Sequence, residues 1–237
     1  MSRFTLTPPR RDEPELMDAP GLPAAEVLEA YRVLRRVNRQ LGNRDTVLRE
    51  IRRLLDDEPE TGPIGSLDVG SGSGDIPEAI RGALGRVGRS GPTITVDHDP
   101  IAAAESARLG LGAVRGDALR LPFAAASIDL VTAVKFAHHF TGEPLSTLVG
   151  EMARVARRRV VVVDIRRHWL AYWGFKAWSR VFTRNRLVRY DGPLSVLRGF
   201  TPDELLDLVR PIAGFSWTVR SAPGFQLVLV GRRIAAR

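Results

Sequence analysis

Apolar residues recur along the first part of the chain with the spacing of a helix. From Ala24 to Leu41 they recur every three or four residues, and the same spacing returns after Gly42-Asn43 up to about residue 57. This spacing predicts two amphipathic helices. Residues 1–20 contain four prolines among many charged residues, which predicts an extended arm ahead of the first helix.

From residue 64 onward, short apolar runs alternate with helical patterns. The expected strands lie at 66–69, 93–96, 113–115, 128–134 and 160–163, and the helices between them lie at 76–84, 100–109 and 144–156. Apolar strands in this β-α order predict an α/β fold with a doubly wound, mostly parallel sheet and helices on both faces. A helix that begins with a capping box of Thr201 and Glu204 follows, and strands at 216–220 and 226–230 predict a final hairpin.

The chain length of 237 residues suits one α/β domain with additions. We expect an arm and helical cap over 1–62 and the main domain over 63–237. Residues 165–198, between the fifth strand and the last helix, form an insert in the position of a substrate lid.

The distribution of charge changes this picture at one place. The net charge is +8, and 12 basic residues against three acidic ones give +9 within 151–198 alone. A local basic segment raises the question of a nucleic acid or an anionic surface as partner.

The absence of cysteine excludes disulfides, a thiolate nucleophile and cysteine-ligated metal sites. No run reaches the ~18 apolar residues of a membrane span, and we expect a cytoplasmic protein.

A glycine-rich loop follows the first strand directly. Residues 68–75 read DVGSGSGD, and glycines between a strand and a helix let the backbone turn tightly and approach a ligand. The spacing is neither that of a dinucleotide loop nor that of a Walker loop. Asp97 ends the second strand, where a carboxylate can accept from ribose hydroxyls, and Asp117 follows the third, where it can accept from an adenine amino group. A lone acid at a strand end is often only a helix cap, but acids at successive strand ends after a glycine loop favour a ligand.

These segments resemble motifs I to IV of the class I S-adenosylmethionine-dependent methyltransferases: LDVGSGSGD, TVDHDP, GDALRLPF and the strand IDLV. The resemblance implies a Rossmann-like methyltransferase fold of seven strands, six parallel and one reversed, that binds S-adenosylmethionine and releases S-adenosylhomocysteine. It also implies roles for individual residues. Gly70, Gly72 and Gly74 would approach the amino acid part of the cofactor, Asp68 the loop or the ammonium group, Asp97 the ribose, His98 the adenine face, and Asp117 and Ala118 the adenine edge.

Two adjacent histidines, His138 and His139, follow the fourth strand. In the resembled family this segment lies beside the reactive methyl group, so one histidine is expected to face the substrate as a general base for a phenol or enol proton, and one to face the structure. A packed, hydrogen-bonded histidine is the alternative for either one. No metal site is expected. The pair resembles the ubiquinone and menaquinone methyltransferase-like branch, from which Lys135 departs.

Three longer segments, at about 15–43, 164–173 and 188–205, resemble small bacterial methyltransferases associated with type III polyketide synthases. This resemblance implies a polyketide-derived phenolic or quinone lipid as acceptor. The candidate substrate residues are Lys135, Phe136, Arg167, Tyr172, Trp173 and Asp191.

Aromatic and basic residues interleave in the insert, which holds three of the four tryptophans. The segment suits a helix over the active site whose aromatics are core, or a lid that lines an apolar channel and touches an anionic membrane through 165–186. Nucleic-acid binding is a third interpretation, which the near-neutral remainder of the chain disfavours.

Together these features predict a methyltransferase that acts on an oxygen or activated carbon of a small phenolic, quinone or polyketide-type acceptor, which can be lipid-like. The alternatives are an RNA methyltransferase that uses 151–198, and a non-catalytic cofactor-binding subunit. The sequence leaves the oligomeric state open.

Overall fold

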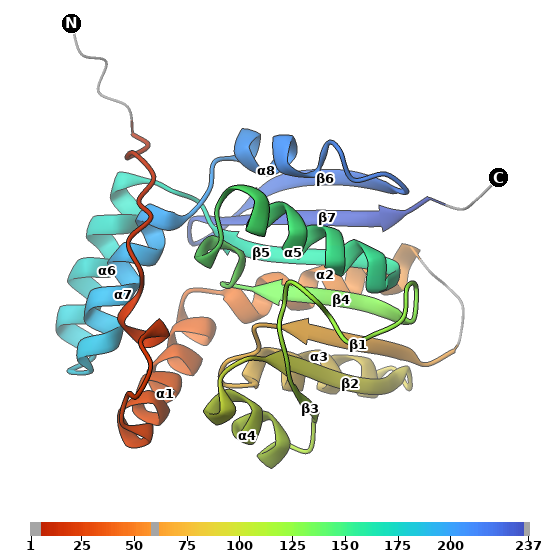
Figure 1. The fold of residues 1–237 in the computed structure, drawn as a ribbon, viewed down its shortest axis with the longest axis horizontal. Helices are drawn as coiled ribbons and strands as arrows, with labels where there is room; N and C mark the ends of the chain where they lie inside the picture. Colours follow the sequence, from red (N-terminus) through yellow and green to blue (C-terminus); the bar gives the residue numbers. More distant parts are fainter. Residues whose placement is uncertain (1–5, 58–61, 235–237) are drawn as a thin grey trace, which may run out of the picture.

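A seven-stranded sheet forms the centre of the molecule, with strand order β3-β2-β1-β4-β5-β7-β6 (Figure 1). The computed structural model describes residues 6–57 and 62–234. The strands are β1 Ile64–Val69, β2 Ser90–Asp97, β3 Gly112–Arg115, β4 Ile128–Val134, β5 Ala156–Ile165, β6 Phe215–Ala222 and β7 Gln226–Arg233. Neighbours from β3 to β5 pair in parallel, whereas β7 is antiparallel to both β5 and β6. The expected doubly wound sheet with one reversed strand is confirmed.

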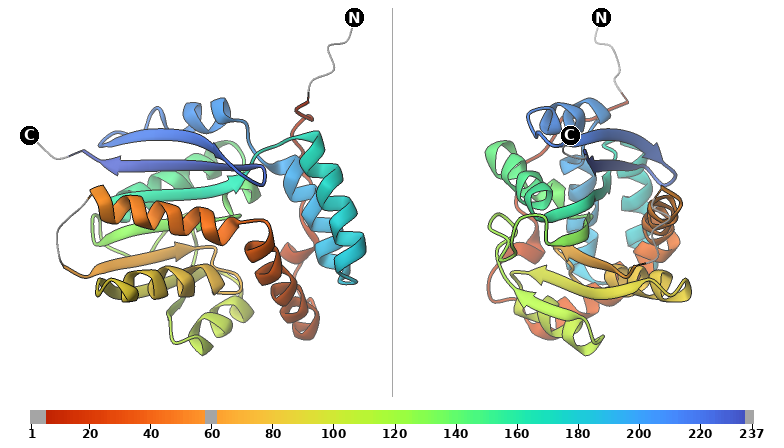
Figure 2. Two further views of the ribbon diagram at one scale, coloured as in Figure 1. Left: turned by 180° about the vertical axis from the view of Figure 1, so that it is seen from behind. Right: turned by 90° about the vertical axis from the view of Figure 1, so that its right-hand side faces the viewer.

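Helices cover both faces of the sheet (Figures 1 and 2). On one face lie α2 (Asn43–Asp57) and α3 (Asp75–Arg86), and on the other lie α5 (Gly142–Val155) and α8 (Pro202–Val209). Strand β5 shows why its sequence is apolar without interruption: Val161 and Val163 pack with α2 and α3, and the alternate residues Val160 and Val162 pack with α5 and α8. Helix α4 (Pro100–Arg108) packs beside β2 and β3.

The remaining elements gather beyond the carboxyl ends of the parallel strands (Figure 1). They are α1 (Ala24–Gln40), α6 (Trp169–Phe182), α7 (Arg186–Arg198) and the arm before α1. The arm contains the short 3-10 turn η1 (Leu16–Asp18), and a second such turn, η2 (Ala137–His139), follows β4. Val33 and Val37 of α1 pack with Leu187 and Val188 of α7. Within the insert, α6 packs against α7, so the insert is a helical hairpin.

Of the two N-terminal helices, α1 lies at the strand ends and α2 packs against the sheet through Val47, Ile51 and Leu54. Residues 1–5 of the expected arm and 58–61 of the expected cap lie outside the described ranges. No helix within the described ranges combines the length and apolar character that crossing a bilayer requires.

Much of the positive charge in 151–198 is used within the fold. Several of its arginines form ion pairs with carboxylates of distant segments. The pairs are Arg157 and Arg158 with Asp129, Arg159 with Asp57, Arg167 with Glu204, and Arg186 with Glu26. These arginines therefore form ion pairs that link separate segments of the chain. Arg180 on α6 and Arg184 just after it are exposed to solvent.

Candidate functional site

The glycine loop turns sharply between β1 and α3. Gly70, Gly72 and Gly74 all have positive φ, at 70°, 48° and 72°. A β-carbon on Gly70 would lie 2.2 Å from the ring of Phe136, so the loop and the segment after β4 touch directly. Gly74 caps α3 and packs against Ser106 and Leu109 of the α4 region.

Two buried or partly buried carboxylates lie at the strand ends beside this loop. Asp97 accepts hydrogen bonds from the backbone N–H groups of Gly72 at 2.9 Å and Asp99 at 3.0 Å, and burial raises its pKa. Asp68 is buried and accepts from the hydroxyl of Thr132 at 2.5 Å, and burial raises its pKa to about 7. The exposed Asp117 accepts from the backbone N–H of Leu119 at 2.8 Å.

A cavity of about 1700 Å³ extends from the glycine loop to the helices beyond the strand ends. It brings together most of the residues selected from the sequence: Asp68, Gly70, Gly72, Asp97, His98, Asp117, Ala118, Lys135, Phe136, His138, His139 and Asp191. Much of the opposite wall is apolar, and consists of Val27, Leu34 and Val37 of α1, Phe175 and Trp178 of α6, and Val188 and Val196 of α7. Protein pockets for a single ligand usually measure about 300–1000 Å³, so this cavity has room for two molecules side by side.

Four selected residues do not line the cavity. Gly74 is the N-cap of α3 at the end of the loop, and buried Arg167 donates to Glu204 and to the carbonyls of Pro8 and Gly199. Tyr172 packs edge-on against Trp169 and Trp173, and the side chain of Trp173 is 57% exposed. The structure thus places the aromatics of α6 on two sides, with Phe175 and Trp178 inward and Trp173 outward.

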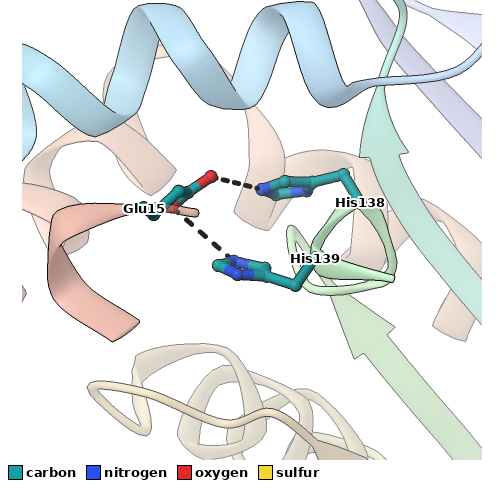
Figure 3. A group of neighbouring side chains, drawn as sticks. All are labelled: Glu15, His138 and His139. Atoms are coloured by element: carbon teal, nitrogen blue, oxygen red, sulfur yellow. Dashed lines mark ion pairs between the residues drawn. The ribbon is translucent and has the colours of Figure 1, made fainter. Parts of the chain in front are cut away.

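The adjacent histidines occupy different environments. The buried ring of His138 has Nδ1 2.7 Å from Asp164 Oδ1 and Nε2 3.5 Å from Glu15 Oε1. Burial alone would lower the pKa of His138, but Asp164 and Glu15 outweigh it and raise the pKa to about 9. His139 is partly exposed, with Nδ1 3.2 Å from Asp18 Oδ2 and Nε2 3.8 Å from Glu15 Oε2 (Figure 3).

Sequence reasoning missed the contribution of the arm to this site. Glu15 lines the cavity, and the hydroxyl of Ser195 donates to its carboxylate at 2.7 Å. Asp191 accepts from the backbone N–H groups of Leu16 at 2.7 Å and Met17 at 3.0 Å, so α7 fastens the arm where Glu15 meets the histidines.

Tyr31 of α1 was missed too, although it lines the cavity and donates to Asp99 at 2.8 Å. Helical spacing marks Tyr31 only as an apolar-face residue, and no pattern links the arm to residue 138.

Comparisons with known proteins agree with the fold. Residues 67–164 match the family described as a methyltransferase domain. No curated protein sequence is a significant match.

Many solved structures share the fold. Magnesium protoporphyrin IX methyltransferase ChlM from Synechocystis PCC 6803, solved with bound SAH, is 17% identical with a TM-score of 0.53, over 81% of this chain and 84% of that one. A SAM-dependent methyltransferase from Aquifex aeolicus is 15% identical with a TM-score of 0.57, over 90% and 100%. The plantazolicin methyltransferase BamL is 11% identical with a TM-score of 0.64, over 88% and 90%. At these identities, the likeness establishes the fold.

Proposed function

We propose that this chain is an S-adenosylmethionine-dependent methyltransferase that methylates an oxygen or activated carbon of a small phenolic, quinone or polyketide-type acceptor. The observation that carries the proposal is that one continuous cavity spans both regions. It joins the glycine loop and the acidic strand ends to an apolar chamber beside two histidines.

The residues at the strand ends fit the cofactor. Gly70 and Gly72 present backbone without side chains to the cavity, and the carboxylates of Asp97 and Asp117 line the same wall. We place the ribose at Asp97, the adenine at His98, Asp117 and Ala118, and the amino acid part at Asp68 and the loop. When bound, S-adenosylmethionine supplies an electrophilic methyl group.

The acceptor is placed in the apolar chamber between α1, α6 and α7. A water-poor, shaped wall favours methyl transfer because it holds the acceptor in line with the methyl group. His138 is held by Asp164 and Glu15 and keeps η2 in place. The partly exposed His139 lines the cavity and accepts the proton that the acceptor loses during methyl transfer.

Calorimetry with S-adenosylmethionine tests the cofactor site. We expect binding by the wild type, a loss of at least tenfold in affinity for Asp97→Ala, and no change for Asp207→Ala, an exposed carboxylate on α8. No heat of binding by the folded wild type would contradict the proposal. Mass spectrometry of lysate metabolites that gain one methyl group with enzyme and cofactor identifies the acceptor, and His139→Ala should slow that transfer more than tenfold.

The outer face of α6 supports a further partner, an anionic membrane surface from which a lipid-like acceptor enters. Trp173 is 57% exposed and lies outside the cavity wall, and exposed Arg180 follows two turns along the helix. Val181, near the end of α6, is 74% exposed, and exposed Arg184 comes just after the helix. Exposed tryptophan and aliphatic side chains next to arginine are typical of helices that lie on an anionic bilayer. The opposite side of the same helix lines the cavity through Phe175 and Trp178.

Co-sedimentation with vesicles tests this surface. We expect binding to vesicles that contain phosphatidylglycerol, weaker binding to pure phosphatidylcholine, and a loss in Trp173→Ala but not in Leu206→Ala, an exposed apolar residue on α8. Equal behaviour of the two variants would contradict the membrane contact. Tight, steeply salt-dependent binding to RNA in place of vesicles would favour an RNA methyltransferase.

A further inference from the structure

We propose that Glu15, His138 and His139 form a binding site for a divalent transition-metal cation in the wall of the acceptor chamber. One carboxylate oxygen and one ring nitrogen from each histidine all lie within 4.8 Å of one another. Figure 3 shows both rings turned toward the carboxylate of Glu15, which reaches them from the arm. Coordination of a common ion requires only a small contraction of this arrangement, since metal–nitrogen and metal–oxygen bonds are about 2.0–2.2 Å.

The ring orientations are those of metal-ligating histidines. Asp164 holds Nδ1 of His138 at 2.7 Å and Asp18 holds Nδ1 of His139 at 3.2 Å, which leaves both Nε2 atoms facing Glu15. A carboxylate on the far ring nitrogen fixes the tautomer and raises the basicity of the ligating nitrogen. Both histidines share this arrangement although their carboxylates come from different elements, β5 and η1.

The surrounding chain holds the three residues in position. The buried Arg198 of α7 donates to the carbonyls of His138 at 3.1 Å, His139 at 2.7 Å and Glu13 at 2.6 Å. One guanidinium therefore joins both histidines to the arm that carries Glu15. The Ser195 hydroxyl orients the Glu15 carboxylate at 2.7 Å.

The charge around the cluster favours a cation. The carboxylates of Glu15, Asp18 and Asp164 contact the two rings, and Asp191 of α7 lies next to Glu15. The positive groups nearby are Lys135, which acts on Asp164, and Arg198, whose donors go to carbonyls. A divalent ion takes the place of the proton on the Nε2 side of His138, between the ring and Glu15, whereas the Nδ1 proton stays in the hydrogen bond to Asp164.

Two imidazoles and one carboxylate suit Zn²⁺, Co²⁺, Fe²⁺ or Mn²⁺, and three protein ligands leave at least one position open. All three residues line the cavity, so the open position is available to an oxygen of the acceptor. This inference rests on the proposed function only for the identity of that oxygen. With the ion bound, His139 is a ligand and no longer the proton acceptor, and a coordinated acceptor hydroxyl, whose pKa the metal lowers, releases its proton to water.

Titration with Co²⁺ tests the site, after chelation has removed metal from the full chain. We expect one Co²⁺ per chain by equilibrium dialysis, with visible absorption bands from nitrogen and oxygen ligands. Glu15→Gln and His139→Asn should each weaken binding by more than tenfold. His168→Asn is the matched control, because His168 is the N-cap of α6 outside the cluster, and asparagine also caps helices.

Wild-type affinity for Co²⁺ no higher than that of Glu15→Gln would overturn the inference. If Glu15→Gln or His139→Asn unfolds the chain, Asp18→Asn provides a second test of the site. Asp18 touches only His139 of the pair at the partly exposed end of the cluster, and its loss should weaken binding by about tenfold. Calorimetry with S-adenosylmethionine on the same samples separates the two proposals: a chain that binds the cofactor but not Co²⁺ retains the proposed function and loses the metal site.

Discussion

The ring of Phe136 occupies the space that a β-carbon on Gly70 would need. The β-carbon would lie 2.2 Å from two ring atoms, and Gly70 has a φ of 70°. The glycine loop of the cofactor wall and the segment that leads to the histidines are therefore packed as one unit, and displacement of either one moves the other.

Gly70→Ala should weaken S-adenosylmethionine binding by on the order of tenfold or more, because the new methyl group pushes Phe136 and the loop apart. Gly88→Ala is the control: Gly88 has a φ of 68° and no atom near the β-carbon position, so it carries the backbone cost of about 1 kcal/mol without the clash. Calorimetry and thermal unfolding measure both effects. Phe136→Ala added to Gly70→Ala should restore part of the affinity, and no recovery would contradict the packing argument.

Asp68 should make stability depend on pH. Burial raises its pKa to about 7, well above the value in an unfolded chain. Between these two values the folded state holds a proton that the unfolded state has released, so the free energy of unfolding falls as pH rises from about 4 to 7. Relative to wild type, Asp68→Asn should gain about 2–4 kcal/mol across this range.

Urea unfolding at pH 4.5, 5.5, 6.5 and 7.5 measures this difference. Asp207→Asn, at an exposed position on α8, should follow the wild type at every pH. A constant offset between Asp68→Asn and wild type would show that Asp68 ionises in the folded chain as it does in the unfolded one.

Local sequence signals were sufficient for the sheet but not for the whole site. The apolar run at 160–163 and the glycine loop specify buried parallel strands and a tight turn, because both follow from neighbouring residues. The position of Glu15 depends instead on contacts with Asp191, Ser195 and Arg198, more than 170 residues away along the chain. The basic insert shows the same limit, since Arg167 is identified as a structural residue only through its contacts with Glu204 and Pro8.

Arg198 should control how firmly the arm is held. Arg198→Lys cannot reach all three carbonyls of His138, His139 and Glu13, and the cost of unpaired buried groups should lower stability by about 2–4 kcal/mol. Amide hydrogen exchange should rise in residues 10–18 and stay unchanged in β4. Arg180→Lys, an exposed change on α6, should alter neither measurement. Wild-type exchange in the arm of Arg198→Lys would show that other contacts hold it.

The two sides of α6 should separate acceptor binding from membrane binding. Trp178 lines the cavity and packs against the cluster of α1 and α7 residues, whereas Trp173 is exposed and absent from the cavity wall. Trp178→Ala should therefore weaken binding of an alkylphenol probe, 5-pentylresorcinol, by about tenfold through lost apolar contact, and leave vesicle binding intact. Trp173→Ala should do the reverse. Fluorescence titration and co-sedimentation measure the two properties on the same samples, with thermal unfolding to confirm that both variants are folded. If both substitutions affected the same property, α6 would not separate the chamber from the membrane-facing surface.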